Sequence, residues 1–319
     1  MSTCTYISPS GTPCIENAQP TKKRCIWHTS AEKNDGNLKA ELESMAKKGD
    51  TLSGFNLARM DLSNAYLIEA DLSDADLSRV DLSLGHLFGA NLSNASLFKA
   101  NLTDANLKEA TLENANLLGT DLTRVNLERV NWGIGNKLYN HKEADAHHKN
   151  GNLKAALEKY LEAEEIYRNI RKCYEAAGTS DIAGSFFYNE MVVKRKQMPK
   201  FSVARMWSRL IDALCGYGEV PYRIIGSAIT YILVNAFLFG MLGLVHNSKI
   251  YALSTTLDFA ENMKYFGYAI YFSIVTFTTL GYGDFAPAGW SRPFAAVEGF
   301  VGAFMIALFI LSFVKKMTR

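Results

Sequence analysis

Residues 90–107 read ANLSNASLFKANLTDANL, and this stretch decides the fold of much of the first half of the chain. A leucine recurs there at every fifth position, and the same spacing continues without a miss from Leu52 to Leu127, with Trp132 in the next place. Neither an α-helix, with a period of about 3.6 residues, nor a β-strand, with a period of about 2, has this repeat. Two positions before most of the leucines stands a small or modestly apolar residue, so each pentad offers two inward groups and three outward ones. The pattern predicts a solenoid with short flat sides.

The residue pattern of these pentads closely resembles that of the pentapeptide-repeat family, whose fold is a right-handed, four-sided β-helix. We assign residues 50–134 to this domain. In that family four pentads make one coil, which implies about four coils here, stacked about 4.8 Å apart. We expect a rigid spacer or binding scaffold without chemistry. Imitation of DNA, attributed to some acidic members of the family, is the alternative, because residues 50–132 hold more Asp and Glu than Lys and Arg.

Residues 1–35, before the repeat, carry a C-x9-C-x10-C-x2-H pattern formed by Cys4, Cys14, Cys25 and His28. The stretch is too rich in proline and glycine to build a core of its own. Three thiolates and one imidazole are a complete tetrahedral ligand set for structural Zn²⁺, and such a set leaves no open position for catalysis. We expect a zinc knuckle. A disordered tail with scattered cysteines and a reactive redox switch are the alternatives.

After Trp132 the apolar residues change to three-and-four spacing, which predicts a helical hairpin over residues 138–198. Gly151-Asn152 and Gly178-Thr179-Ser180 supply the breaks and an N-cap. Residues 151–160 resemble a tetratricopeptide-like helix pair, which usually mediates contacts. A cluster of three histidines is interpreted as a set of surface residues on a polar helix, with metal binding as the alternative: His141, His147 and His148.

Residues 201–218 place apolar side chains on one helical face and charged ones opposite, which predicts an amphipathic helix in the membrane interface or, alternatively, in a soluble domain. Two apolar runs, 224–245 and 294–314, are each long enough to cross a hydrocarbon core of about 30 Å. Between them, residues 265–278 are apolar but reach only about half that length. This is the size expected of a re-entrant helix.

The segment that follows, residues 278–284, reads TTLGYGD. It resembles the selectivity filter of potassium channels, and residues 221–319 as a whole resemble their two-transmembrane pore domain. The resemblance implies that backbone carbonyls replace the hydration shell of K⁺. It also implies the site residues, with ion sites at Thr279, Leu280, Gly281, Tyr282 and Gly283 and with filter support from Thr278, Asp284 and Glu298. Leu280 departs from the more usual Val, which puts filter packing and inactivation in doubt rather than selectivity.

Elementary chemistry supports these residue types. Gly281 and Gly283 permit the unusual dihedral angles that turn successive carbonyls toward one axis. Glu298 lies about one turn inside the second span, where an ionised side chain facing lipid costs several kcal/mol. We expect it to contact the back of the pore helix or filter in its own or a neighbouring subunit; a lipid-facing charge that snorkels outward is the alternative. Gly299 and Gly302 either form a hinge or allow close packing.

Composition and charge bound the function. A formal net charge of +2 argues against bulk attraction to nucleic acid, and an odd cysteine count of 5 argues against a disulfide framework. Basic residues precede the first span and follow the second, at Lys315, Lys316 and Arg319, so both termini are expected in the cytoplasm, with the chain multi-pass in the plasma (inner) membrane. No nucleophile, acid–base pair or open metal site is recognisable, so an enzyme is not expected.

The sequence therefore predicts one subunit of a homotetrameric potassium-selective channel in a lipid bilayer, with K⁺ in the pore and structural Zn²⁺ in the N-terminal knuckle. The cytoplasmic N-terminal module is expected to regulate the pore, through an unidentified cytoplasmic partner on the β-helix or hairpin. Two alternatives stay open. One is a membrane-tethered scaffold in which the pore serves only to tetramerise the chain, and the other is a weakly selective cation pore.

Overall fold

The computed structural model describes residues 3–9, 11, 13–14, 16–19, 23–30, 33 and 36–317. The chain divides into two compact units, Met1–Arg205 and Met206–Arg319, and each is described by itself. Arg319, one of the basic residues used above to predict orientation, lies outside the described residues.

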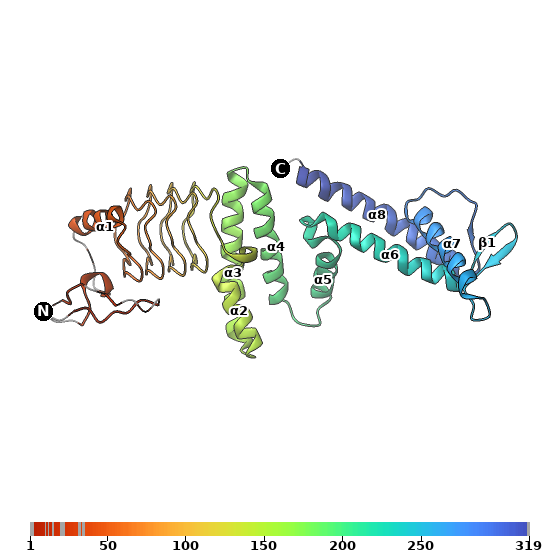
Figure 1. Ribbon diagram of the computed structural model, residues 1–319, viewed down its shortest axis with the longest axis horizontal. Helices are drawn as coiled ribbons and strands as arrows, with labels where there is room; N and C mark the ends of the chain where they lie inside the picture. The colour runs from red at the N-terminus through yellow and green to blue at the C-terminus, as the bar shows by residue number, and fades with distance from the viewer. Residues whose placement is uncertain are drawn as a thin grey trace. The chain divides into compact units, whose positions relative to one another are not determined.

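The leucine repeat forms a stack of coils, drawn in orange to yellow in Figure 1. Short parallel bridges join residues twenty positions apart, from Asn56↔Asp76 to Thr111↔Asn131. Twenty residues are four pentads, so one coil takes four pentads. At each corner a leucine carbonyl accepts a hydrogen bond from the N–H three residues later, as Leu62 does from Ala65 at 3.0 Å. The residue between, Asn64, has a φ of 56°, as a type II turn requires.

The core of the stack lies inside the coils. Every leucine of the repeat from Leu52 to Leu127 is at most 5% exposed, and the residues two positions earlier are buried with few exceptions. This confirms the predicted pattern of two inward groups per pentad. Outside, polar side chains pair from coil to coil: the Asn101 amide donates to Asp81 at 3.0 Å. Burial of the leucine column supplies the main stabilising free energy.

The N-terminal end of the stack is covered by η1 (Ile26–His28) and α1 (Gly36–Lys48). The Asn56 N–H donates to the Trp27 carbonyl at 2.7 Å. Leu42 of α1 is fully buried in the same core as the repeat leucines. The N-terminal segment therefore takes the place of a preceding coil.

The C-terminal end is covered by helices. After η2 (Ile134–Asn136), residues 138–198 fold as three helices rather than the two of a hairpin: α2 (Tyr139–Lys149), α3 (Leu153–Ala176) and α4 (Ser180–Gln197). The Trp132 indole N–H donates to the Tyr174 hydroxyl at 2.8 Å, and that hydroxyl donates to the Leu127 carbonyl at 3.0 Å. The last coil is thus joined to α3 by hydrogen bonds through a buried aromatic pair.

His141 is buried, at 3% exposed, and is not the surface residue that the sequence predicted. Its Nδ1 lies 3.0 Å from the Tyr167 hydroxyl and its Nε2 lies 3.2 Å from Lys196 Nζ. Burial, reinforced by Lys196, lowers the pKa of His141 to about 3, so the ring is neutral at physiological pH. The sequence around His141 is polar and gave no sign of burial, because the residues that bury it come from α3 and α4. His147 and His148 are half-buried.

The second unit consists of helices and one small sheet. In chain order its elements are α5 (Val203–Cys215, which begins in the first unit), η3 (Gly216–Gly218), α6 (Pro221–Leu242), β1 (Leu244–His246), β2 (Lys249–Tyr251), α7 (Phe259–Phe277), β3 (Ala286–Pro287) and α8 (Ser291–Met317). The sheet has the order β2-β1-β3, and both pairings are antiparallel. Within the described residues, α6 and α8 are the helices long and apolar enough to cross a membrane.

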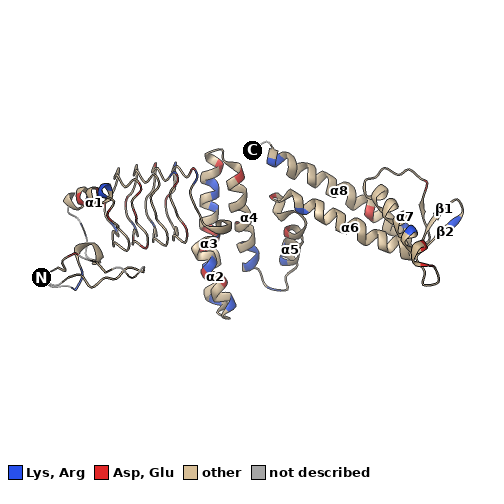
Figure 2. Ribbon diagram, in the orientation of Figure 1, with Lys and Arg blue, Asp and Glu red and all other residues tan. Residues whose placement is uncertain are grey.

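Helix α7 packs on both α6 and α8, as Figure 1 shows. Phe272 of α7 meets Phe239 of α6 edge to face, with ring centroids 5.0 Å apart. The helix begins six residues earlier than the expected start at residue 265. Its first two turns, which include Glu261, are polar, so an apolar run in the sequence does not include them. In α8 the charged residues lie near the two ends, with Glu298 as the inner exception (Figure 2).

Candidate functional site

The 278–284 segment begins where α7 ends and runs to β3. Its backbone alternates: φ is 56° at Thr279, 59° at Gly281 and 78° at Gly283, whereas the residues between them have negative φ. Glycine adopts such angles freely, but a β-branched threonine in this region is strained. Strain of this kind is found where the backbone itself performs a task. The alternation is what a row of carbonyls directed to one side needs.

Hydrogen bonds tie the start of the segment to the last turns of α7. The Thr278 hydroxyl donates to the Ile274 carbonyl at 2.7 Å, and the Leu280 N–H donates to the Val275 carbonyl at 3.0 Å. At the other end His246 Nδ1 lies 2.6 Å from the Asp284 carbonyl, a contact that the sequence did not suggest. A segment held at both ends is preorganised.

The side chains of Leu280 and Tyr282 are 59% and 67% exposed in the single chain. Within one chain, most of the surface of both side chains is therefore uncovered.

Glu298 of α8 is fully buried and faces α7 rather than the outside of the unit. The Ser273 hydroxyl donates to its Oε1 and also lies 2.9 Å from the Ile232 carbonyl of α6. Its second oxygen, Oε2, is buried without a hydrogen-bond partner among the described residues. The sequence analysis did not single out Ser273. Its position as a lone serine in an apolar run was the one feature of the sequence that could have indicated a polar contact there. One polar contact thus joins all three helices behind the 278–284 segment.

Gly302 packs directly on the end of α7. A Cβ added there would overlap the Phe277 carbonyl oxygen and would lie 2.8 Å from its carbon. At Gly299 an added Cβ would meet only the Thr276 carbonyl, at an ordinary 3.6 Å. Helix α8 is continuous through both positions. Close packing is therefore the reading that the geometry favours for Gly302.

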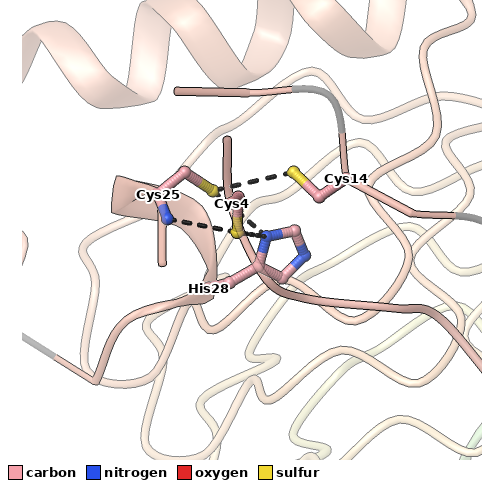
Figure 3. A group of neighbouring side chains, drawn as sticks. All are labelled: Cys4, Cys14, Cys25 and His28. Atoms are coloured by element: carbon pink, nitrogen blue, oxygen red, sulfur yellow. Dashed lines mark hydrogen bonds between the residues drawn. The ribbon is translucent and has the colours of Figure 1, made fainter. Parts of the chain in front are cut away.

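A separate cluster lies in the first unit, where the structure brings together Cys4, Cys14, Cys25 and His28 (Figure 3). One donor atom from each residue lies within 4.8 Å of the others. His28 Nδ1 is 3.1 Å from Cys25 Sγ and 3.7 Å from Cys4 Sγ, and the Cys14 and Cys25 sulfurs are 3.9 Å apart. Cys4, Cys25 and His28 are buried.

Helix α5 leaves one apolar face uncovered. The exposed side chains include Val203, Met206, Trp207 and Leu210, of which Val203 is 69% exposed. On the other side Arg223 pairs with Asp212 at 2.7 Å, which links α5 to the start of α6. A face of this kind suits a membrane interface.

Comparisons with known proteins divide the chain in the same way. Residues 232–319 match the family model described as "Ion channel", and residues 51–83 and 89–129 match eight copies of the pentapeptide repeat. The gap at 84–88 is not a break in the structure, where the coil continues through it. No curated protein matches the chain.

Solved structures that are similar to the chain include pentapeptide repeat proteins. One from Nostoc is 37% identical over 27% of this chain and 72% of its own length, with a TM-score of 0.26. One from the cyanobacterium Cyanothece is 36% identical over 24% of this chain and 55% of its own, and one from the Arabidopsis thaliana thylakoid lumen is 35% identical over 24% and 48%; both have a TM-score of 0.15. Each of these three structures matches about a quarter of the chain.

Proposed function

Because the chain combines a pentapeptide-repeat domain with an ion-channel domain of the pore-loop type, we propose that it is one subunit of a homotetrameric, potassium-selective channel. The observation that carries the proposal is the 278–284 segment. It has the composition TTLGYGD, lies between two apolar helices at the end of α7, and alternates positive and negative φ.

Selectivity for K⁺ follows from the chemistry of such a segment. A dehydrated cation needs oxygen ligands in place of water, and carbonyls from Thr279 to Tyr282, with the Thr279 hydroxyl, provide them. At position 280 the backbone carbonyl, and not the side chain, faces the ion in this arrangement, so the leucine there does not alter the ligands.

Four copies are needed because a single segment cannot surround an ion. Exposure supports this, because in the single chain both α6 and α8 leave most of their apolar residues unburied. The remaining apolar surface suits lipid and neighbouring subunits. With basic residues before α6 and at the end of α8, both termini lie on the cytoplasmic side of the plasma membrane.

Regulation is assigned to the N-terminal unit. Its coils are rigid and carry no recognisable catalytic group, so their role is to bind a cytoplasmic partner and to act on α5 through the covalent connection from α4. The apolar face of α5 lies in the membrane interface and precedes α6 in the chain, so a displacement of α5 reaches the pore helices directly.

The test is ion flux through the purified full-length protein in liposomes under opposed K⁺ and Na⁺ gradients. We expect K⁺ flux well above Na⁺ flux. Gly281→Ala forces a Cβ into the left-handed region at about 1–2 kcal/mol and should abolish selective flux. Gly267→Ala, where an added Cβ meets nothing within 4 Å, is the matched control and should conduct normally.

A chain starting at Phe201 tests the regulation. Altered flux on truncation supports control by the first unit, and unaltered flux refutes it. Comparable Na⁺ and K⁺ permeability would instead indicate a weakly selective cation pore. If intact tetramers conducted no ions, and if cells with Gly281→Ala had the same phenotype as cells with the wild type, the chain would be a membrane-tethered scaffold instead.

A further inference from the structure

We propose that Cys4, Cys14, Cys25 and His28 bind one Zn²⁺ ion, and that this ion holds Trp27 in place as the cap on the N-terminal edge of the β-helix. The four residues belong to the first unit, at one end of the repeat, so the proposal does not rest on channel activity.

The donor geometry fits zinc. Bonds of about 2.3 Å to sulfur and about 2.0–2.1 Å to nitrogen, at tetrahedral angles, place neighbouring donors roughly 3.5–3.8 Å apart. Three separations between donor atoms in the cluster, 3.1, 3.7 and 3.9 Å, lie around this value. In addition, the Cys25 N–H donates to Cys4 Sγ at 3.2 Å, the kind of outer contact that orients a sulfur ligand.

The ring of His28 is held by its surroundings. Tyr6 stacks on it with centroids 3.8 Å apart, and Phe55 of the first coil meets it edge to face at 5.2 Å. Four soft or borderline donors in a closed set select Zn²⁺ over hard cations such as Mg²⁺ or Ca²⁺.

The link to the β-helix is the Trp27 carbonyl. Within the stack, the amide of a coil bonds to the carbonyl 21 residues earlier, as Asp76 does to Phe55 at 2.8 Å. Asn56 has no preceding coil, and its N–H donates to Trp27 at 2.7 Å instead. The Trp27 ring also stacks on Phe55, with centroids 5.3 Å apart.

Trp27 lies between the ligands Cys25 and His28, so a metal that fixes both also fixes Trp27. Helix α1 covers a second side of the same coil, where Glu43 Oε1 accepts from the Tyr66 N–H at 3.0 Å. An uncovered strand edge can pair with the edge of another chain, and a cap at this end of the β-helix prevents such pairing.

The experiment uses the full-length chain in detergent. Elemental analysis should find about one zinc per chain in the wild type and in Cys173→Ser, whose sulfur lies outside the cluster, and none in Cys25→Ser. Zinc is then removed from the wild type with a chelator and added back as Zn²⁺ alone, while hydrogen exchange follows the amides of Asn56 and Asp76.

We expect the Asn56 amide to exchange at least about tenfold faster without zinc and to regain protection when zinc returns, because local opening frees its acceptor. Asp76, one coil further, should not change. Wild-type protein with iron, or with no metal, would overturn the zinc assignment, as would a Cys14–Cys25 disulfide in freshly purified protein, which would indicate a redox switch. Zinc loss without any change at Asn56 would overturn the capping role.

Discussion

Gly302→Ala should damage the channel domain, whereas Gly299→Ala should not. Both substitutions add one methyl group to the same helix, three residues apart. At position 302 the new Cβ would lie 2.8 Å from the Phe277 carbonyl carbon, whereas ordinary contacts are 3.4–4 Å. Helix α8 must therefore move away from α7 by roughly 0.6 Å or more.

The cost can be worked from this overlap. Overpacking of a close contact costs about 1–3 kcal/mol, and the gain in helix propensity from Gly to Ala returns up to about 1 kcal/mol. The expected net loss is about 1–2 kcal/mol, which is a factor of about 5–30 in the folded population. Gly299→Ala meets only Thr276 at 3.6 Å and should be neutral or slightly stabilising.

Two measurements check this prediction: unfolding of the detergent-solubilised full-length chain by SDS, followed by helicity, and K⁺ flux in liposomes. Phe277 directly precedes the 278–284 segment, so displacement at Gly302 should lower flux as well as stability. Equal losses of flux in both variants would mean that α8 needs bending at these glycines. A fully normal Gly302→Ala protein would refute the packing argument itself.

Three further predictions follow from other parts of the chain. Leu97→Ala empties part of the fully buried leucine column and should destabilise the first unit by about 3–5 kcal/mol in thermal unfolding, whereas Leu84→Ala, at a 56% exposed corner, should have little effect. Burial lowers the pKa of His141 to about 3 from an unfolded value of about 6.5, so the unfolded chain binds more protons than the folded chain below pH 6.5. The free energy of unfolding should therefore fall by up to about 1.4 kcal/mol per pH unit on acidification from pH 6.5 to 4.5 and stay level above pH 7. In His141→Gln this slope should be absent. Glu298→Gln disturbs the contact with Ser273 and should lower stability by about 1 kcal/mol and reduce K⁺ flux; unchanged flux and unfolding would show that this carboxyl group does not support the 278–284 segment.

The repeat could be predicted in detail because its information is local. Each pentad carries its own inward pair, and only the coil of four pentads had to come from the family resemblance. The 278–284 segment was equally recognisable, since its glycines stand where positive φ is required. The positive φ at Thr279 could not be foreseen, because threonine disfavours it.

What failed depended on contacts between distant residues. His141 was placed on the surface because its neighbours in the sequence are polar, but the residues that bury it, such as Tyr167, come from another helix. Glu298 contacts α7, as expected, but its partner Ser273 lies 25 residues away and could not be identified from the sequence around either residue. The Trp27 carbonyl is a backbone group, so its hydrogen bond with the Asn56 N–H could not be predicted from a pattern of side chains.

The twenty-residue step of the β-helix also sets how this protein can change length. One added coil lengthens the stack by about 4.8 Å and leaves the two ends in the same angular relation. One added pentad instead turns the distal end by about a quarter revolution, because each coil has four sides. Insertions in evolution or in the laboratory would thus adjust reach and angle in discrete, separable steps, and the capped ends allow such growth without exposing a strand edge.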